Sequence, residues 1–276
     1  MVIKRKPPRL GQHLLTSHTI ARAVVAAAHV SKKDTVLEIG PGKGMLTGEI
    51  LATGARVRAV EKDPQMVATL EDVFAAEIAN AQLTLYTEDA RTFLQNTEHA
   101  PVLNAGYKIV ANIPYYITGA LLRLFLTAPV QPTDVSLLVQ KEVAERIVKN
   151  KKESILSLSV QAYGTPHYVR TVKAGSFNPP PNVDSAILAI SNISRKNFTG
   201  AVSEEKFFEL LHSGFGQKRK TLLGNLKKAF SGEHSAVSIT EIEEVFKHYS
   251  IDKKVRAEDV PLETWLRLAR ELKTET

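Results

Sequence analysis

The sequence contains no cysteine among its 276 residues. Disulfide bonds, thiolate metal sites and cysteine nucleophiles are therefore excluded. The eight histidines do not follow the spacing of metal ligands, and His13 and His18 have no third partner close by in the sequence, so we expect no metal site. The sequence also lacks an apolar run of about eighteen residues, and no apolar segment follows the charged N-terminal residues. These absences predict a cytoplasmic protein that does not bind a membrane.

Acidic residues are missing from two stretches of a chain whose formal net charge is +7. None precedes Asp34, and none lies between Gln217 and Lys228. Clusters of one sign favour binding to a polyanion, although basic residues also serve simply to solvate a surface. The cations are Lys4, Arg5, Lys6, Arg9, Arg22, Lys32 and Lys33 in the first stretch, and Lys218, Arg219, Lys220, Lys227 and Lys228 in the second.

Short apolar runs that are typical of buried strands alternate with helical patterns over the first part of the chain. The predicted strands cover residues 34–39, 56–60, 83–86, 107–111 and 135–140. This alternation predicts a doubly wound parallel sheet, in which ligands bind at the carboxyl ends of the strands. Two further strands, 167–173 and 183–190, follow one another without a helix between them. They predict an antiparallel hairpin at the end of the sheet.

The strand patterns stop near Ser194, where a polar segment begins. The remaining sequence has the apolar periodicity of helices, predicted at residues 204–215, 218–230, 240–249 and 261–272. We therefore expect two domains, with residues 1–194 forming the α/β domain and residues 195–276 a small all-α domain.

A glycine-rich segment, Gly40-Pro41-Gly42-Lys43-Gly44, connects the first predicted strand to a helix. Such a loop brings backbone amides close to a ligand, which suits dinucleotide cofactors and S-adenosylmethionine alike. The dinucleotide pattern requires glycine or alanine where this chain has Met45, which disfavours a dehydrogenase. Glu38 lies two residues before the glycines. It can support the loop or meet the ammonium group of a cofactor.

Carboxylates follow the next two predicted strands. Glu61 ends the second strand, where a carboxylate can accept hydrogen bonds from both hydroxyls of an adenosine ribose. Asp89 follows the third strand, where it can accept from an adenine amine. Taken alone, Glu61 would be better explained as a solvated residue at a strand end. The succession of the two acids predicts one site for an adenosine-containing cofactor.

The fourth predicted strand ends in Asn112-Ile113-Pro114-Tyr115. The Asn112 amide and the Ile113 carbonyl can accept hydrogen bonds from a flat amine while the Tyr115 ring stacks on it. The N6 amine of adenine fits this arrangement. A strand terminus followed by a turn would also explain Asn and Pro at these positions.

Seven segments spread over almost the whole chain carry a closer resemblance. They are residues 11–15 (Gly-Gln-His-Leu-Leu), 38–44, 112–115, 140–146, 177–185, 218–222 and 256–258. Together they resemble the KsgA (RsmA) family of ribosomal RNA adenine N6,N6-dimethyltransferases. His13 and Leu14 depart from the Asn-Phe of many members, and Ile113 from the more frequent leucine.

The resemblance implies a Rossmann-like class I fold that uses S-adenosylmethionine, with a small all-α C-terminal domain for RNA recognition. It implies that Phe177 closes over the target adenine opposite Tyr115, although a core aromatic beside a rigid turn explains Phe177 equally well. The implied cofactor contacts are His13, Leu15, Gly40, Glu61, Asp89 and Asn112, and the implied catalytic group is Asn112, Ile113, Pro114, Tyr115 and Phe177.

The resemblance also implies a reaction. Methyl groups would pass from S-adenosylmethionine to N6 of two adjacent adenosines near the 3′ end of small-subunit (16S) ribosomal RNA, leaving S-adenosylhomocysteine and requiring no metal. The substrate would be an immature 30S-type particle, and the enzyme a monomer with a role in small-subunit biogenesis. The alternatives are an Erm-type enzyme acting on large-subunit (23S) RNA and a non-catalytic ribosome-assembly factor that binds RNA.

Overall fold

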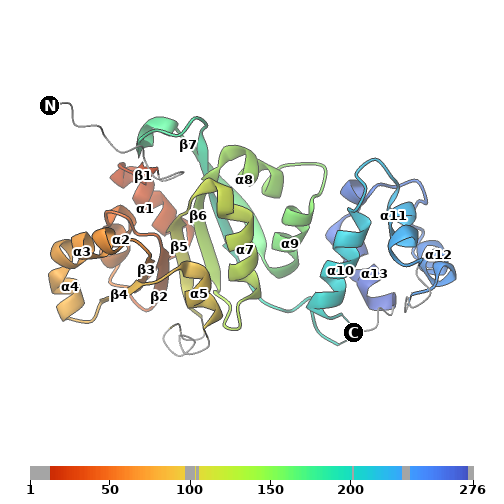
Figure 1. Ribbon diagram of the computed structural model, residues 1–276, viewed down its shortest axis with the longest axis horizontal. Helices are drawn as coiled ribbons and strands as arrows, with labels where there is room; N and C mark the ends of the chain where they lie inside the picture. Colours follow the sequence, from red (N-terminus) through yellow and green to blue (C-terminus); the bar gives the residue numbers. More distant parts are fainter. Residues whose placement is uncertain (1–12, 97–102, 104–105, 201, 232–236, 273–276) are drawn as a thin grey trace. The chain divides into compact units, whose positions relative to one another are not determined.

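The computed structural model describes residues 13–96, 103, 106–200, 202–231 and 237–272. The chain folds into two compact units, which are residues 1–145 with 165–193, and residues 146–164 with 194–276 (Figure 1). The predicted domain boundary near residue 194 falls where the second part of unit 2 begins. Residues 146–164, which the sequence patterns placed in the first domain, pack with unit 2 because their helix α9 (Ile155–Tyr163) contacts α10 (Glu204–Gly214) and α13 (Leu262–Glu271).

A seven-stranded mixed sheet forms the centre of the first unit. Its order is β4-β3-β2-β5-β6-β9-β7. The first five of these strands are parallel, and β9 is antiparallel to both β6 and β7. The strands are β2 (Thr35–Ile39), β3 (Arg56–Glu61), β4 (Leu83–Thr87), β5 (Lys108–Asn112), β6 (Asp134–Gln140), β7 (Thr165–Val172) and β9 (Ser185–Ser191). The predicted doubly wound sheet with a terminal antiparallel hairpin is confirmed.

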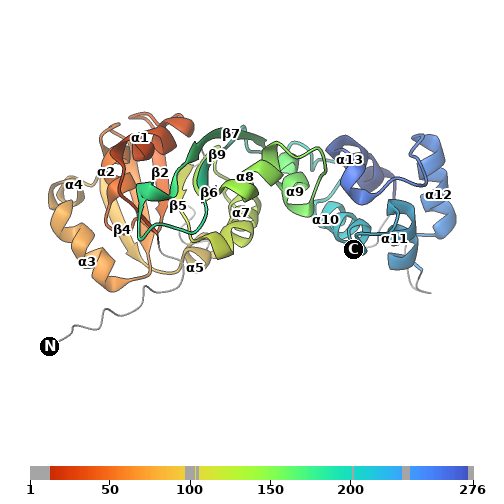
Figure 2. The same cartoon turned by 90° about the horizontal axis from the view of Figure 1, so that it is seen from above.

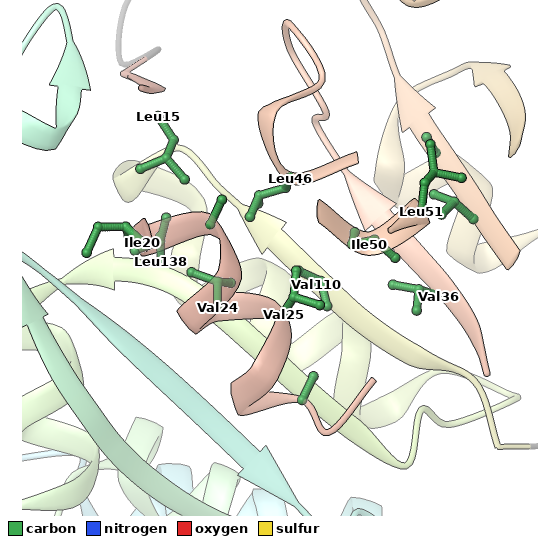
Figure 3. Close-up of a cluster of buried hydrophobic side chains, with 14 of the residues drawn as sticks. Leu15, Ile20, Val24, Val25, Val36, Leu46, Ile50, Leu51, Val110 and Leu138 are labelled. Atoms are coloured by element: carbon green, nitrogen blue, oxygen red, sulfur yellow. The ribbon is translucent and has the colours of Figure 1, made fainter. Parts of the chain in front are cut away.

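Helix α1 (His18–Ala27) begins where Ser17 accepts a hydrogen bond from the Ile20 amide at 3.4 Å. Its apolar residues recur every three or four positions and so form one buried face. Figure 3 shows Val24 and Val25 of this face next to Val110 of β5. Helix α2 (Met45–Leu51) packs beside α1 and adds Leu46, Ile50 and Leu51 to the same core. This core includes Val36 of β2.

The other face of the sheet is covered by α5 (Ala90–Gln95) and α7 (Thr118–Thr127), as Figure 2 shows. Both helices follow strand ends directly, because Asp89 caps α5 and the short 3-10 helix η2 (Tyr115–Ile117) leads into α7. Helices α3 (Pro64–Val73) and α4 (Ala75–Ala79) cover the β3–β4 edge, and α8 (Lys141–Val148) follows β6.

A two-stranded sheet that the sequence patterns did not predict joins the N-terminal segment to the β7–β9 connection. Strand β1 (Leu14–Leu15) pairs antiparallel with β8 (Phe177–Asn178), so that Leu15 lies opposite Phe177. The 3-10 helix η3 (Ala174–Ser176) precedes β8, and the Thr16 amide donates to the Ser176 carbonyl at 2.9 Å. Residues far apart in sequence thus form one border of the sheet's carboxyl edge.

The second unit is helical in the part that the structure describes. Besides α9, α10 and α13 it contains α11 (Leu222–Ala229), α12 (Ile239–His248) and the 3-10 helix η4 (Ala257–Asp259). Trp265 of α13 is fully buried. Gly214 at the end of α10 permits this packing, because a Cβ there would overlap the Trp265 ring. No helix among the described residues of either unit is long and apolar enough to cross a membrane.

Candidate cofactor and adenine site

The carboxyl ends of the parallel strands border a cavity of about 700 Å³ in the first unit. This volume lies within the usual range for small-molecule sites. The predicted site residues that line it are His13, Leu15, Gly40, Glu61, Asp89, Asn112, Ile113, Pro114 and Tyr115. Phe177 is the one predicted site residue that does not line it.

The glycine loop is open towards the cavity on one side and closed by protein on the other. Gly40 has a φ of +66°, and a Cβ there would meet no atom within 4 Å. Gly42 has a φ of +58°, and a Cβ there would lie 2.9 Å from Leu14 Cδ2. Both positions therefore require glycine for their backbone conformation. The open side at Gly40 gives a ligand close access to the backbone.

Glu61 fixes the glycine loop to the end of β3. Its side chain is buried, and its two carboxylate oxygens accept from Gly42 N at 3.3 Å and Asp63 N at 3.0 Å. Each oxygen has a second lone pair, so Glu61 retains two acceptor positions. Glu61 lines the cavity, and these positions match the two hydroxyls of a ribose.

Glu38 is buried beneath the loop and does not line the cavity. Its Oε2 accepts from the Thr47 hydroxyl at 2.7 Å, which connects β2 to α2. Its Oε1 has no hydrogen-bond partner among the described residues. Burial raises the pKa of Glu38 to about 8. The hydrogen bond from Thr47 lowers the pKa in part, and the charge of Glu61 raises it by a smaller amount. The carboxyl is therefore largely protonated at neutral pH.

Asp89 is held by Arg91, a residue that the sequence patterns did not single out. Asp89 Oδ1 accepts from Arg91 N at 2.9 Å and from Arg91 Nε at 3.0 Å, and Oδ2 accepts from Nη2 at 3.3 Å. These hydrogen bonds, that from the side chain foremost, hold the pKa of Asp89 below its ordinary value. Asp89 is thus a carboxylate with a fixed orientation, and Oδ2 keeps a free lone pair. Arg91 also lines the cavity.

The Asn112 amide is oriented by the N-terminal segment. Its Nδ2 donates to the His13 carbonyl at 2.9 Å, which leaves Oδ1 as the acceptor. The His13 ring nitrogen Nδ1 lies 2.8 Å from the Pro179 carbonyl, so that the ring donates there. His13 thereby connects the end of β5 to the segment that follows β8.

Tyr115 is half-buried beside Asn112. Its ring stacks on the His13 ring with centroids 5.8 Å apart and an interplanar angle of 29°. Its hydroxyl lies 2.5 Å from Ser185 Oγ. Burial raises the pKa of Tyr115, and the hydrogen bond to Ser185 opposes this. The ring is consequently fixed in position at the cavity wall.

Phe177 lies in the hydrophobic core. It is 3% exposed and belongs to the cluster that contains Leu15, Ile20 and Leu138. Its neighbour Asn178 lines the cavity instead. In this structure Phe177 packs as a core aromatic, and its predicted role opposite Tyr115 requires the ring to leave that cluster.

The basic residues 218–220 form an exposed loop in the second unit. We predicted that they lie in a helix, but α11 starts at Leu222 after the cap residue Thr221. The reason is the buried Asn225 side chain, which donates to the carbonyls of Gly214 at 2.6 Å and Gln217 at 3.1 Å and so holds the loop before the helix. The other predicted basic segment, residues 4–9, lies outside the described residues.

The chain is similar to known proteins over nearly its full length. The profile of a family described as "Ribosomal RNA adenine dimethylase" matches residues 3–274. A protein of Dehalococcoides mccartyi named "Ribosomal RNA small subunit methyltransferase A" is 40% identical over 95% of this chain and 87% of its own length. A protein of the same name from Lactococcus lactis is 35% identical over 95% of this chain and 88% of its own length.

Solved structures show the same fold. A dimethyladenosine transferase of Plasmodium falciparum superposes with a TM-score of 0.75 at 25% identity, covering 93% of this chain and 96% of that one. The 23S rRNA methyltransferase ErmE superposes with a TM-score of 0.73 at 22% identity, covering 94% of this chain and 99% of that one.

Proposed function

The chain belongs to the ribosomal RNA adenine dimethylase family, and from this premise we propose how its residues perform the reaction. It is an S-adenosylmethionine-dependent enzyme that transfers methyl groups to N6 of two adjacent adenosines near the 3′ end of small-subunit ribosomal RNA. The observation that carries the proposal is the meeting of four strand ends, bearing Gly40, Glu61, Asp89 and Asn112, at one cavity.

The residues between the glycine loop and Asp89 would hold S-adenosylmethionine, which supplies the methyl group. Glu61 accepts from the two ribose hydroxyls with the lone pairs that its contacts to backbone amides leave free. Asp89 accepts from the adenine amine of the cofactor through Oδ2. His13 and Leu15 cover the cofactor from the N-terminal segment. The open side of the loop at Gly40 admits the methionine part.

The target adenine enters beside Asn112. Its N6 is a poor nucleophile because the lone pair is delocalised into the ring. Hydrogen bonds from the amine to Asn112 Oδ1 and the Ile113 carbonyl favour a pyramidal nitrogen whose lone pair points at the methyl group. N6 would then bond to the methyl carbon as the bond of that carbon to the sulfonium sulfur breaks, the amine would lose a proton to solvent, and S-adenosylhomocysteine would remain. Catalysis in this scheme is orientation and electrostatics, without a metal.

The aromatic wall holds the base once it has left its stack. Tyr115 is fixed by His13 and Ser185, and it offers its ring to the face of the adenine. Pro114 restrains the backbone between Ile113 and Tyr115. Phe177 closes over the opposite face if its ring leaves the core.

RNA recognition belongs to the second unit, in which Lys218, Arg219 and Lys220 form the exposed loop held by Asn225. Adenine chemistry alone does not distinguish one adenosine from another, so selectivity has to come from the shape and phosphates of the surrounding RNA. We propose that the substrate is an immature 30S-type particle and that the enzyme acts as a monomer. The enzyme then acts in the cytoplasm, where the small subunit is assembled.

The decisive experiment supplies the purified chain with methyl-labelled S-adenosylmethionine and with small subunits that lack this modification. We expect label in two adjacent adenosines near the 3′ end, identified as N6,N6-dimethyladenosine by mass spectrometry. Label in large-subunit RNA instead would make the enzyme Erm-type. Cofactor binding by calorimetry without any transfer would identify a non-catalytic assembly factor.

A further inference from the structure

Tyr116 is an exposed aromatic residue at the mouth of the cavity. It is 70% exposed and lines the cavity directly after the half-buried Tyr115. Its backbone is fixed, because the Ile117 amide donates to the Pro114 carbonyl at 3.2 Å and the Thr118 hydroxyl to the Tyr115 carbonyl at 3.0 Å. Among the described residues no ring stacks on it. A rigid support therefore presents a bare aromatic face to solvent.

A positive charge lines the same cavity. The Arg91 side chain is 70% exposed and uses one edge of its guanidinium for Asp89. Its pKa is raised first by that hydrogen bond and then by the charge of Asp89. Arg91 and Tyr116 both line the cavity. An aromatic face and a guanidinium at one cavity are the combination that binds an unpaired nucleotide, with the base on the ring and a phosphate near the charge.

We propose that Tyr116 is the stacking platform for the nucleotide that adjoins the target adenosine. This inference rests on the proposed function. When one adenosine leaves its stack and enters the cavity, a face of its covalent neighbour loses its stacking partner. That neighbour remains at the mouth of the cavity, because one phosphodiester linkage joins it to the target adenosine beside Tyr115. The ring of Tyr116 replaces the lost partner.

The platform suits a substrate that is methylated twice in succession. The neighbour is an unmodified adenine during one reaction and a dimethylated adenine during the other. Stacking uses the face of the base and tolerates either form, whereas a hydrogen bond to N6 would be lost on methylation. A single aromatic side chain can thus serve both adenosines.

The test combines protein variants with altered RNA. Small subunits are reconstituted with a synthetic 3′ segment that carries either both adenosines or one adenosine beside an abasic nucleotide, on each side in turn. Tyr116→Ala should lower kcat/KM on the two-adenosine substrate by about 5- to 150-fold, the usual effect of losing one base–aromatic stack. Tyr116→Phe and Tyr116→Trp should stay near the parent. Cofactor affinity should not change in any of them.

The abasic substrates isolate the contact. If Tyr116 stacks on the neighbour, the parent is less active on at least one abasic substrate than on the two-adenosine substrate. On that abasic substrate Tyr116→Ala should be as active as the parent. Equal losses for Tyr116→Ala on all three substrates, or no loss on the two-adenosine substrate, would overturn the proposal. Val169→Ala is the matched control, because Val169 is 45% exposed on β7 and does not line the cavity.

A binding measurement covers the case in which abasic substrates are turned over too slowly. 2-Aminopurine at the neighbouring position should be quenched in the parent complex and remain bright with Tyr116→Ala, and equal emission in both complexes would contradict stacking. Failure of the parent to methylate the two-adenosine substrate would refute the proposed function itself. If instead the parent is active and Tyr116→Ala is equally active, only the stacking proposal is refuted.

Discussion

Replacing Glu38 with glutamine should stabilise the protein in a manner that depends on pH. Glutamine keeps the shape of the side chain and can still accept from Thr47, but it does not ionise. The pKa of Glu38 is about 8 in the folded chain, against 4.5 for the unperturbed group. Each pKa unit corresponds to about 1.4 kcal/mol, so the difference of about 3.5 units amounts to roughly 5 kcal/mol.

The sign follows from where the proton is held. Between pH 4.5 and 8 the folded chain keeps the Glu38 proton that the unfolded chain has released. The unfolded state therefore binds fewer protons, and the stability of the parent falls as pH rises through this window. The stability of Glu38→Gln does not fall in this way, because glutamine does not ionise. Its advantage over the parent should be small near pH 5, grow steadily, and level off above pH 8.

Urea unfolding at several pH values from 5 to 8.5 measures this difference. Far-UV circular dichroism follows both units, while the fluorescence of Trp265, the single tryptophan of the chain, reports on the second unit. The gain should appear in the circular dichroism transition of the first unit. Glu71→Gln, an exposed carboxylate on α3, is the control and should show no such trend. A difference between Glu38→Gln and the parent that stays constant across the pH range would refute the reasoning.

The same variant separates the two roles considered for Glu38. If the ammonium group of the cofactor meets a charged Glu38, binding at pH 7 must release the proton that about nine-tenths of the free molecules carry. Calorimetry in buffers of different ionisation enthalpy would detect close to one proton released by the parent and none by Glu38→Gln. If Glu38 only supports the loop through Thr47, both proteins bind without proton release.

Three further predictions follow from the site and the basic loop. Glu61→Ala should weaken cofactor binding by at least one hydrogen bond to a charged group, about 1.5 to 3 kcal/mol or roughly 10- to 150-fold, whereas the exposed Glu71→Ala should not; unchanged calorimetric affinity in a folded variant would remove Glu61 from the ribose site. Tyr115→Ala should lower turnover far more than cofactor affinity, and a collapse of the melting temperature with turnover per folded molecule intact would make the ring purely structural. Asn225→Leu should raise KM for ribosomal particles without changing cofactor affinity, and replacing residues 218–220 with glutamine should do the same. The glutamine variant should also reduce the slope of log RNA affinity against log salt concentration by roughly 0.7 to 0.9 for each lost phosphate contact. Slopes and rates equal to those of the parent would assign RNA recognition to another part of the chain.

The predictable part of the fold depended on local periodicity. Buried strands of a parallel sheet are continuous apolar runs, and the five parallel strands of the large sheet were found in this way. The two antiparallel strands β7 and β9 were predicted from their succession without a helix between them. The polar groups at the ends of the parallel strands could then be assigned to one edge, because parallel strands that alternate with helices bring their carboxyl ends together. Gly40, Glu61, Asp89 and Asn112 indeed line a common cavity.

What was missed depends on long-range pairing. Strands β1 and β8 have two residues each, too few for any period to be recognised, and they exist only because each finds the other. The burial of Phe177 follows from this pairing, since its partner Leu15 is in the same core. The start of helix α11 depends similarly on the Asn225 side chain, whose hydrogen bonds reach back eight and eleven residues.

The missed pairing explains how the site is held in readiness. Asn112, Glu61 and Asp89 each use part of their hydrogen-bonding capacity within the protein, which fixes their orientation, and each keeps an acceptor lone pair for a ligand. A site arranged in this way needs little reorganisation when charge shifts during reaction. For Asn112 the fixing partner is the backbone carbonyl of His13, so its orientation requires the N-terminal segment to be in place. Because β1 pairs with β8 and the His13 ring donates to the Pro179 carbonyl, the oxygen that we propose as acceptor for the adenine amine is oriented only when the two segments that border the cavity have come together.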